Sequence, residues 1–228
     1  MSKKLFPVNL KDETKELITD LSEMGLDKAI ETVSIESKWL QDLPIVKWLF
    51  IANDAKTSLQ TVFFVKKYAS FIGQVKDIAE PNELVNELLE DEKEVDQLID
   101  HSMLYLDRYH TELKAKLLGE LFIQTFKFKK FSVSEYNDLM FGIGEIHPYQ
   151  GMGLLKRFYE YHQETQNIES PEQFRDVNTR GSAIPFYSIA NTGLLHLPNG
   201  GSRMDDLGGA MLNELGVRFY ENVITKIA

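Results

Sequence analysis

The chain has 228 residues, a formal net charge of −10 at pH 7 and no cysteine. The lack of cysteine excludes a disulfide framework, a thiolate zinc site and a cysteine nucleophile, and the acidic balance argues against general binding of phosphate backbones. A content of 43% hydrophobic and 26% charged residues is typical of a globular protein, and residues 1–10 lack the apolar run of a signal peptide, so we expect a folded cytoplasmic protein.

The most apolar part of the chain lies in its first third. Apolar residues at helical spacing predict helices over residues 10–25 and 27–40, and a proline ends the second of them. Two apolar stretches follow, 44–52 and 55–78, and the consecutive apolar residues 62–65 predict a helix that is apolar nearly all round. We expect residues 62–65 to lie at the centre of the fold, within a buried hairpin.

Helical patterns continue through the middle of the chain. Pro81 suits the first turn of a helix, and one apolar stripe then runs to Leu106, before a turn near Tyr109. Ser132 and Glu135 have the spacing of a capping box, in which each side chain accepts from the other residue's backbone N–H. These signals predict an all-helical body.

The composition of the sequence changes after residue 141. Glycines at positions 142, 144, 151 and 153 predict a mobile junction rather than the interior of a helix or strand. We therefore divide the chain into a helical body, residues 1–141, and a second part, residues 142–228, that holds the junction and a small subdomain.

The second part contains the only predicted β-structure. A helix over residues 149–165 and another beginning at Ser170 precede two short strands, at 193–197 and 209–213. Gly193 is expected to end a helix, Leu195 and Leu197 to alternate along the first strand, a Gly-rich turn at 199–201 to join the strands, and Asn213 to cap a closing helix.

Two resemblances accompany these patterns. Leu-Pro-Ile-Val-Lys-Trp-Leu at 43–49, Phe-Val-Lys-Lys-Tyr at 64–68 and Leu-Leu-Gly-Glu-Leu-Phe at 117–122 resemble a widespread group of uncharacterised helical proteins of bacteria and phages. That resemblance implies no activity, and it implies a role in defence or its evasion only through the variable gene content to which such proteins belong.

The end of the chain resembles the wing and last helix of a winged-helix domain. The segments that carry the likeness are residues 193–195, 210–216 and 217–220, with Asn213 where that family often has a capping threonine. The predicted fold class is mainly α: a multi-helix bundle with a small C-terminal winged-helix-like subdomain containing a short β-hairpin. Residues 131–228 hold seven basic and twelve acidic side chains, so duplex DNA is not expected as a partner.

Candidate catalytic and metal-binding groups are few. His147, with Glu145 beside it in the glycine-rich junction, is the best single candidate for a general base, and the alternative is a turn residue that precedes Pro148. Asp107 and His110 have the spacing of a carboxylate–histidine pair on one helix face, against a solvated face as the alternative. The motifs of the common nucleotide-binding and hydrolase sites are missing from the sequence, and we expect no cofactor.

Basic side chains give the candidate interaction residues. Lys127, Lys129 and Lys130 alternate with the aromatic residues 126, 128 and 131, which allows either a stacking strip for single-stranded nucleic acid or a basic helix end. Arg203, between the two predicted strands, is a further candidate.

The sequence favours a non-enzymatic regulatory or defence-related protein that acts through a protein partner, with a homo-oligomer as an open alternative. A first rival function is a membrane-active effector that uses the apolar hairpin at 44–72. It is not favoured because the run at 44–52 has nine residues and contains a lysine, which is too short to span a bilayer. A second rival is a hydrolase or nuclease that uses His147.

Overall fold

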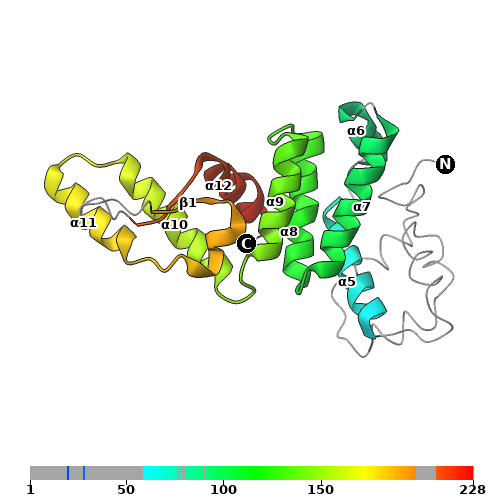
Figure 1. Cartoon of the computed structure of the whole chain (residues 1–228), viewed down its shortest axis with the longest axis horizontal. Coiled ribbons are helices and arrows are strands. Elements are labelled where there is room, and N and C mark those ends of the chain that lie inside the picture. The colour runs from blue at the N-terminus through cyan, green and yellow to red at the C-terminus, as the bar shows by residue number, and fades with distance from the viewer. Residues whose placement is uncertain are drawn as a thin grey trace. The chain divides into compact units, whose positions relative to one another are not determined.

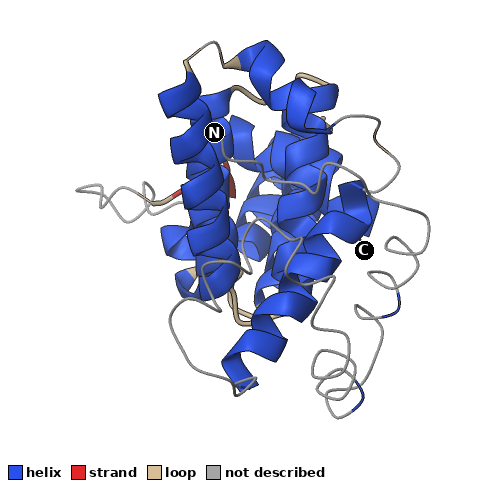
Figure 2. Cartoon of the chain, turned by 90° about the vertical axis from the view of Figure 1, so that its right-hand side faces the viewer, coloured by secondary structure: helices blue, strands red, loops and turns tan. Residues whose placement is uncertain are grey.

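The computed structural model of the chain describes residues 20, 28, 59–75, 78, 81–89, 91–198 and 209–227. Within these ranges the chain is mainly helical, with one small two-stranded antiparallel sheet near the C-terminus, as Figures 1 and 2 show. The predicted fold class is confirmed to this extent. Asp20 and Lys28 are helical, and the rest of the helices expected at 10–25 and 27–40 lies outside the described residues, as do the apolar stretch at 44–52, the turn at 199–201 and Arg203.

The chain divides into two compact units, Met1–Asn137 and Asp138–Ala228. The division falls inside helix α9, Val133–Glu145, whereas the change in sequence composition predicts it after residue 141. None of the helices in the described ranges is long and apolar enough to cross a membrane.

In the first unit, helices α5 and α8 pack along each other. The described helices of this unit before α9 are α5 Leu59–Val75, α6 Pro81–Leu88, α7 Glu92–Arg108, α8 Glu112–Phe122 and the π-helical turn η1 Ile123–Lys127. A row of aromatic rings lies in the core. The centroid of the Phe122 ring is 6.4 Å from that of Phe71 and 4.6 Å from that of Phe126, and the centroids of Phe126 and Tyr136 are 5.3 Å apart. These contacts fix η1 and the start of α9 against α8.

The prediction for residues 62–65 is correct for three of them and wrong for Phe63. Val62, Phe64 and Val65 are buried, but 47% of Phe63 is exposed. Lys66, one turn later, pairs with Glu112, the first residue of α8, at 2.8 Å. Successive residues of a helix point in directions about 100° apart, so Phe63 faces an open side of α5 between its buried neighbours. The helix is also not apolar all round, since the buried face includes Lys66.

Local signals place the helix ends of the first unit. Pro81 begins α6, and the stripe that we read as continuous breaks at Asp91, which caps α7 by accepting from the Lys93 N–H at 2.9 Å. The capping box is confirmed: Ser132 N–H donates to Glu135 at 2.8 Å, and Glu135 N–H donates to Ser132 Oγ at 3.1 Å.

The second unit packs the C-terminal part of α9 with helices and a hairpin. Its further described elements are α10 Gly151–Gln166, α11 Pro171–Ser182, the 3₁₀ turn η2 Tyr187–Thr192, β1 Leu195–His196, β2 Met211–Leu212, α12 Glu214–Phe219, the π-helical turn η4 Tyr220–Ile224 and α13 Thr225–Ile227. The strands are antiparallel, with Leu195 opposite Leu212. Gly193 ends η2 at φ 73°, and Asn213 Oδ1 accepts from the Gly216 N–H at 2.7 Å, so the predicted order of helix end, strands and capped closing helix is confirmed.

Two expectations about the second unit are wrong. Gly142 and Gly144 lie inside α9, and Gly151 and Gly153 begin α10, so these glycines belong to helices and not to a loose junction. A Cβ at position 142 would lie 2.4 Å from the Thr192 carbonyl oxygen, which shows that glycine is needed there for close backbone approach.

Leu197 also departs from the predicted alternation. Its side chain is 44% exposed, while Leu194 and Leu195 are both buried. The strand consists of only Leu195 and His196, so the period of two has no room to continue.

Candidate functional site

Two exposed tyrosines lie on neighbouring segments of the second unit. Tyr149 is 92% exposed in the turn between α9 and α10, and Tyr187 is 83% exposed at the start of η2. Ser188 Oγ lies 3.4 Å from Gln150 Oε1, which brings the two segments together. We call Tyr149 and Tyr187, with Pro148, Pro185 and Phe186 beside them, the tyrosine surface.

Buried residues anchor both segments. Ile146 and Ile189 are almost completely buried, and the close approach of Gly142 to Thr192 holds η2 against α9. The Tyr187 ring also stacks on Phe186, with 4.6 Å between ring centroids. The two tyrosine rings are thus exposed to solvent, while buried residues hold the backbone that carries them. A fixed backbone lowers the conformational entropy that is lost when such a side chain is bound.

The tyrosine surface lies in two stretches of sequence that lack charge. Residues 146–155 and 181–202 contain no Asp, Glu, Lys or Arg, in a chain that is 26% charged. The cores of protein–protein interfaces are depleted in charged residues and enriched in tyrosine. None of the candidate residues predicted from the sequence lies on this surface, although the two charge-free runs are a sequence signal that points to it.

The side chain of His147 forms hydrogen bonds with the backbone of the turn that carries Tyr149. Its Nδ1 atom accepts from the N–H groups of Tyr149 and Gln150, at 3.3 and 3.2 Å. In a neutral imidazole the proton is then on Nε2, so the lone pair that a general base needs is already engaged. Glu145 is exposed, and in the stretch 91–198 the structure shows no hydrogen bond that joins it to His147. This geometry matches the turn-residue alternative.

Asp107 and His110 do not share a helix face. Helix α7 ends at Arg108, so His110 lies in the following turn, and both side chains are exposed. Among the described residues no group of three or more His, Asp or Glu side chains is placed to hold a metal ion. The backbone carbonyl of Asp107 instead accepts from the ammonium group of Lys67. Burial lowers the pKa of Lys67, and the charge of Asp107 opposes that shift.

Lys127 is the last residue of η1, and Lys129 and Lys130 lie in the exposed turn that follows it. We call residues 127–130 the basic turn. The Phe128 ring is 51% exposed, with the Lys127 ammonium 5.4 Å from its centroid, and Lys129 adopts a left-handed conformation at φ 54°. Because the aromatic residues 126 and 131 are buried, the three-ring stacking strip that we considered does not form. A basic helix end with one exposed ring remains.

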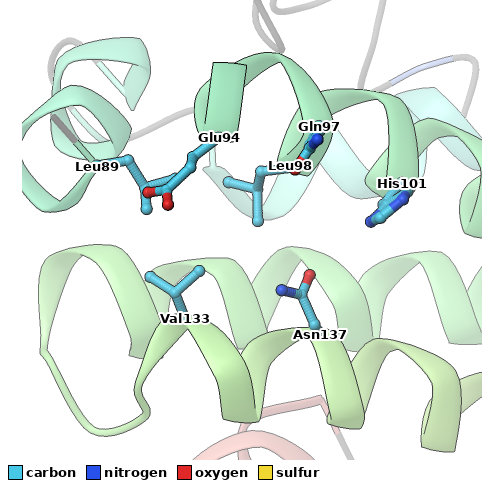
Figure 3. Close-up of a pocket in the computed structure, with 7 residues that line it drawn as sticks. All are labelled: Leu89, Glu94, Gln97, Leu98, His101, Val133 and Asn137. Carbon is cyan, nitrogen blue, oxygen red and sulfur yellow. The ribbon is translucent and has the colours of Figure 1, made fainter. Parts of the chain in front are cut away.

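A groove lies between α7 and α9 in the first unit, and Figure 3 shows the side chains that line it. Its volume is about 340 Å³. The lining residues are Leu89, Glu94, Gln97, Leu98, His101, Val133 and Asn137. We call this the α7–α9 groove. It brings together residues that are distant in sequence, so the sequence offered no signal for it.

The polar groups of the groove are free within the described part of the chain. Glu94, Gln97 and His101 make no side-chain hydrogen bond or ion pair there. The Asn137 Oδ1 atom is buried and has no donor among the described residues. A buried acceptor without a partner carries a desolvation cost of about 1–3 kcal/mol, which a bound donor would relieve.

Comparison of the chain with protein-family models, with curated proteins and with solved structures finds no match.

Proposed function

We propose that this chain is a non-enzymatic regulatory or defence-related protein that binds a protein partner through the tyrosine surface. The observation that carries the proposal is the pair of almost fully exposed rings, Tyr149 and Tyr187, on anchored backbone. The regulatory or defence-related part rests on the resemblance of residues 43–122 to helical proteins of bacteria and phages.

The energetics of tyrosine burial support this choice of surface. Burying one exposed aromatic side chain removes roughly 150–250 Å² from water, and the apolar part of that area contributes about 2 kcal/mol or more. A tyrosine has few side-chain torsions to fix, so little of this gain is lost to ordering. Two such rings supply the anchors of a protein interface.

The chemistry of the surface favours protein over nucleic acid or lipid headgroups. Phosphate groups require cations, and the segments that carry Tyr149 and Tyr187 contain no Lys or Arg. Their hydroxyl groups and the nearby prolines instead suit an uncharged, partly apolar surface on the partner.

A capture experiment tests the proposal. The immobilised full chain is exposed to native lysate, and retained proteins are quantified for the wild type, for the double variant Tyr149→Ser/Tyr187→Ser, and for Phe174→Ser. Phe174 is a matched control because it is a 54% exposed aromatic residue of the same unit, on α11.

We expect a protein that is retained by the wild type and by Phe174→Ser, and that the double variant retains at least about tenfold less, as the loss of two interface anchors implies. The melting temperature should not change, since the two side chains are exposed. Equal retention by all three proteins would contradict the proposal.

The partner can also be a second copy of the chain. In that case light scattering gives twice the monomer mass for the wild type and Phe174→Ser, and the monomer mass for the double variant. A dimer that survives in the double variant would exclude the tyrosine surface as its interface.

A further inference from the structure

The α7–α9 groove combines apolar side chains with unpartnered polar groups. Among its lining residues Leu98 is buried, and Leu89 and Val133 are partly covered. Glu94 and His101 from α7, and Asn137 from α9, line the same space, and Figure 3 shows the Asn137 amide directed from α9 toward α7. The apolar residues favour aliphatic carbon, while the polar groups set what the ligand must carry.

The polar groups of the groove favour a ligand with hydrogen-bond donors. The Asn137 Oδ1 atom is a buried acceptor without a donor in the described chain, and the Glu94 carboxylate accepts hydrogen bonds and brings a negative charge. A ligand that satisfies both has N–H groups and a positive charge. An acceptor-only ligand would leave Oδ1 unsatisfied, and an anion would be repelled by Glu94.

We propose that the α7–α9 groove binds a small organic cation of the alkylguanidinium class. The planar guanidinium group has several N–H donors in a fixed fork, which suits a carboxylate and an amide oxygen on opposite walls. A volume of about 340 Å³ lies at the lower end of the range for ligand pockets, so the ligand is small. The net charge of −10 also raises the local concentration of cations.

The probe is butylguanidinium, titrated at low salt into the isotope-labelled full chain and followed by the shifts of backbone amide signals. Butylurea is the matched neutral ligand, because it keeps the planar shape and three of the N–H donors but has a carbonyl oxygen in place of one NH2 group and lacks the charge. Glu94→Gln removes the carboxylate charge, Asn137→Leu removes the acceptor, and Glu92→Gln is the control, since Glu92 is an exposed acid of α7 outside the groove.

We expect saturable shifts for butylguanidinium, confined to residues near 94–101 and 133–137, and binding at least about tenfold weaker for butylurea and for Glu94→Gln, the loss typical of one charged hydrogen bond. Asn137→Leu should weaken binding as well, and Glu92→Gln should not. If Asn137→Leu fails to fold, Glu94→Gln still decides, because its side chain is exposed. Unsaturable shifts, equal binding of butylurea, or equal loss in Glu92→Gln would overturn the proposal.

Discussion

The contact between α9 and η2 predicts opposite outcomes for two alanine substitutions. Gly142 lies inside α9, and a Cβ there would be 2.4 Å from the Thr192 carbonyl oxygen. Gly153 lies near the start of α10, and a Cβ there meets nothing within 4 Å. The two substitutions have the same chemistry, so their difference reports only the surroundings.

The magnitude follows from two opposing terms. Replacing a helical glycine with alanine stabilises a helix by about 0.5–1 kcal/mol. At Gly153 this gain should appear almost undiminished. At Gly142 the new methyl group must push against a backbone carbonyl, which cannot rotate away, and overpacking of this kind costs about 1–3 kcal/mol. The free energy of unfolding should therefore fall by about 1–2 kcal/mol for Gly142→Ala and rise by about 0.5 kcal/mol for Gly153→Ala.

Urea denaturation followed by far-ultraviolet circular dichroism measures both values in the full chain. Hydrogen exchange of the η2 amides adds a local readout, since Gly142→Ala should accelerate exchange there and Gly153→Ala should not. If Gly142→Ala stabilises the protein as much as Gly153→Ala does, then η2 does not pack on α9, and the anchoring of Tyr187 argued above fails.

Three further predictions concern the first unit. Phe64→Ala should lower the free energy of unfolding by about 3–5 kcal/mol, because the Phe64 ring is buried. Phe63→Ala should lower it by less than about 1 kcal/mol, because the Phe63 ring is half exposed. Equal losses for the two variants in urea denaturation would contradict this difference in burial. Lys129→Gly should raise the free energy of unfolding by about 1 kcal/mol, because glycine adopts a φ of 54° without strain, and an unchanged or lower midpoint would refute this. Burial raises the pKa of Tyr136 above its usual value near 10, so above pH 10 the unfolded state loses this proton while the folded state keeps it. The free energy of unfolding should then fall by about 1.4 kcal/mol per pH unit because of this residue. Between pH 10 and 11 the free energy of unfolding of Tyr136→Phe should fall less steeply with pH than that of the wild type. Equal slopes for the two proteins would contradict this prediction.

The sequence predicted those features that depend on a few adjacent residues. The capping box of Ser132 and Glu135, the cap of α12 by Asn213 and the end of η2 at Gly193 all formed as expected. Each involves a side chain and backbone groups within about one turn, so a short pattern contains the whole interaction. The same reasoning correctly placed the two short strands.

The errors concern residues whose surroundings come from elsewhere in the chain. Four consecutive apolar residues cannot reveal which side of α5 stays open to solvent, and Phe63 lies on that side. A glycine inside α9 resembles a loop glycine until Thr192 is placed against it.

The two candidate sites also depend on residues that are distant in the sequence. The tyrosine surface joins two turns that are far apart in sequence, through Gln150 and Ser188. The α7–α9 groove joins His101 to Asn137 across two helices. Charge and aromatic content indicate which segments to examine, but only the packing of the helices shows which side chains face the same space.

Site-specific photocrosslinking tests the central claim most directly. Benzoylphenylalanine replaces Tyr187 in one protein and Phe174 in another, each protein is produced in the cells that normally make the chain, and the products are separated after irradiation. We predict a discrete crosslinked product from position 187, either with a partner protein or with a second copy of the chain, and none from position 174. A chain that remains uncrosslinked at position 187, or that gives the same products from both positions, would contradict the account.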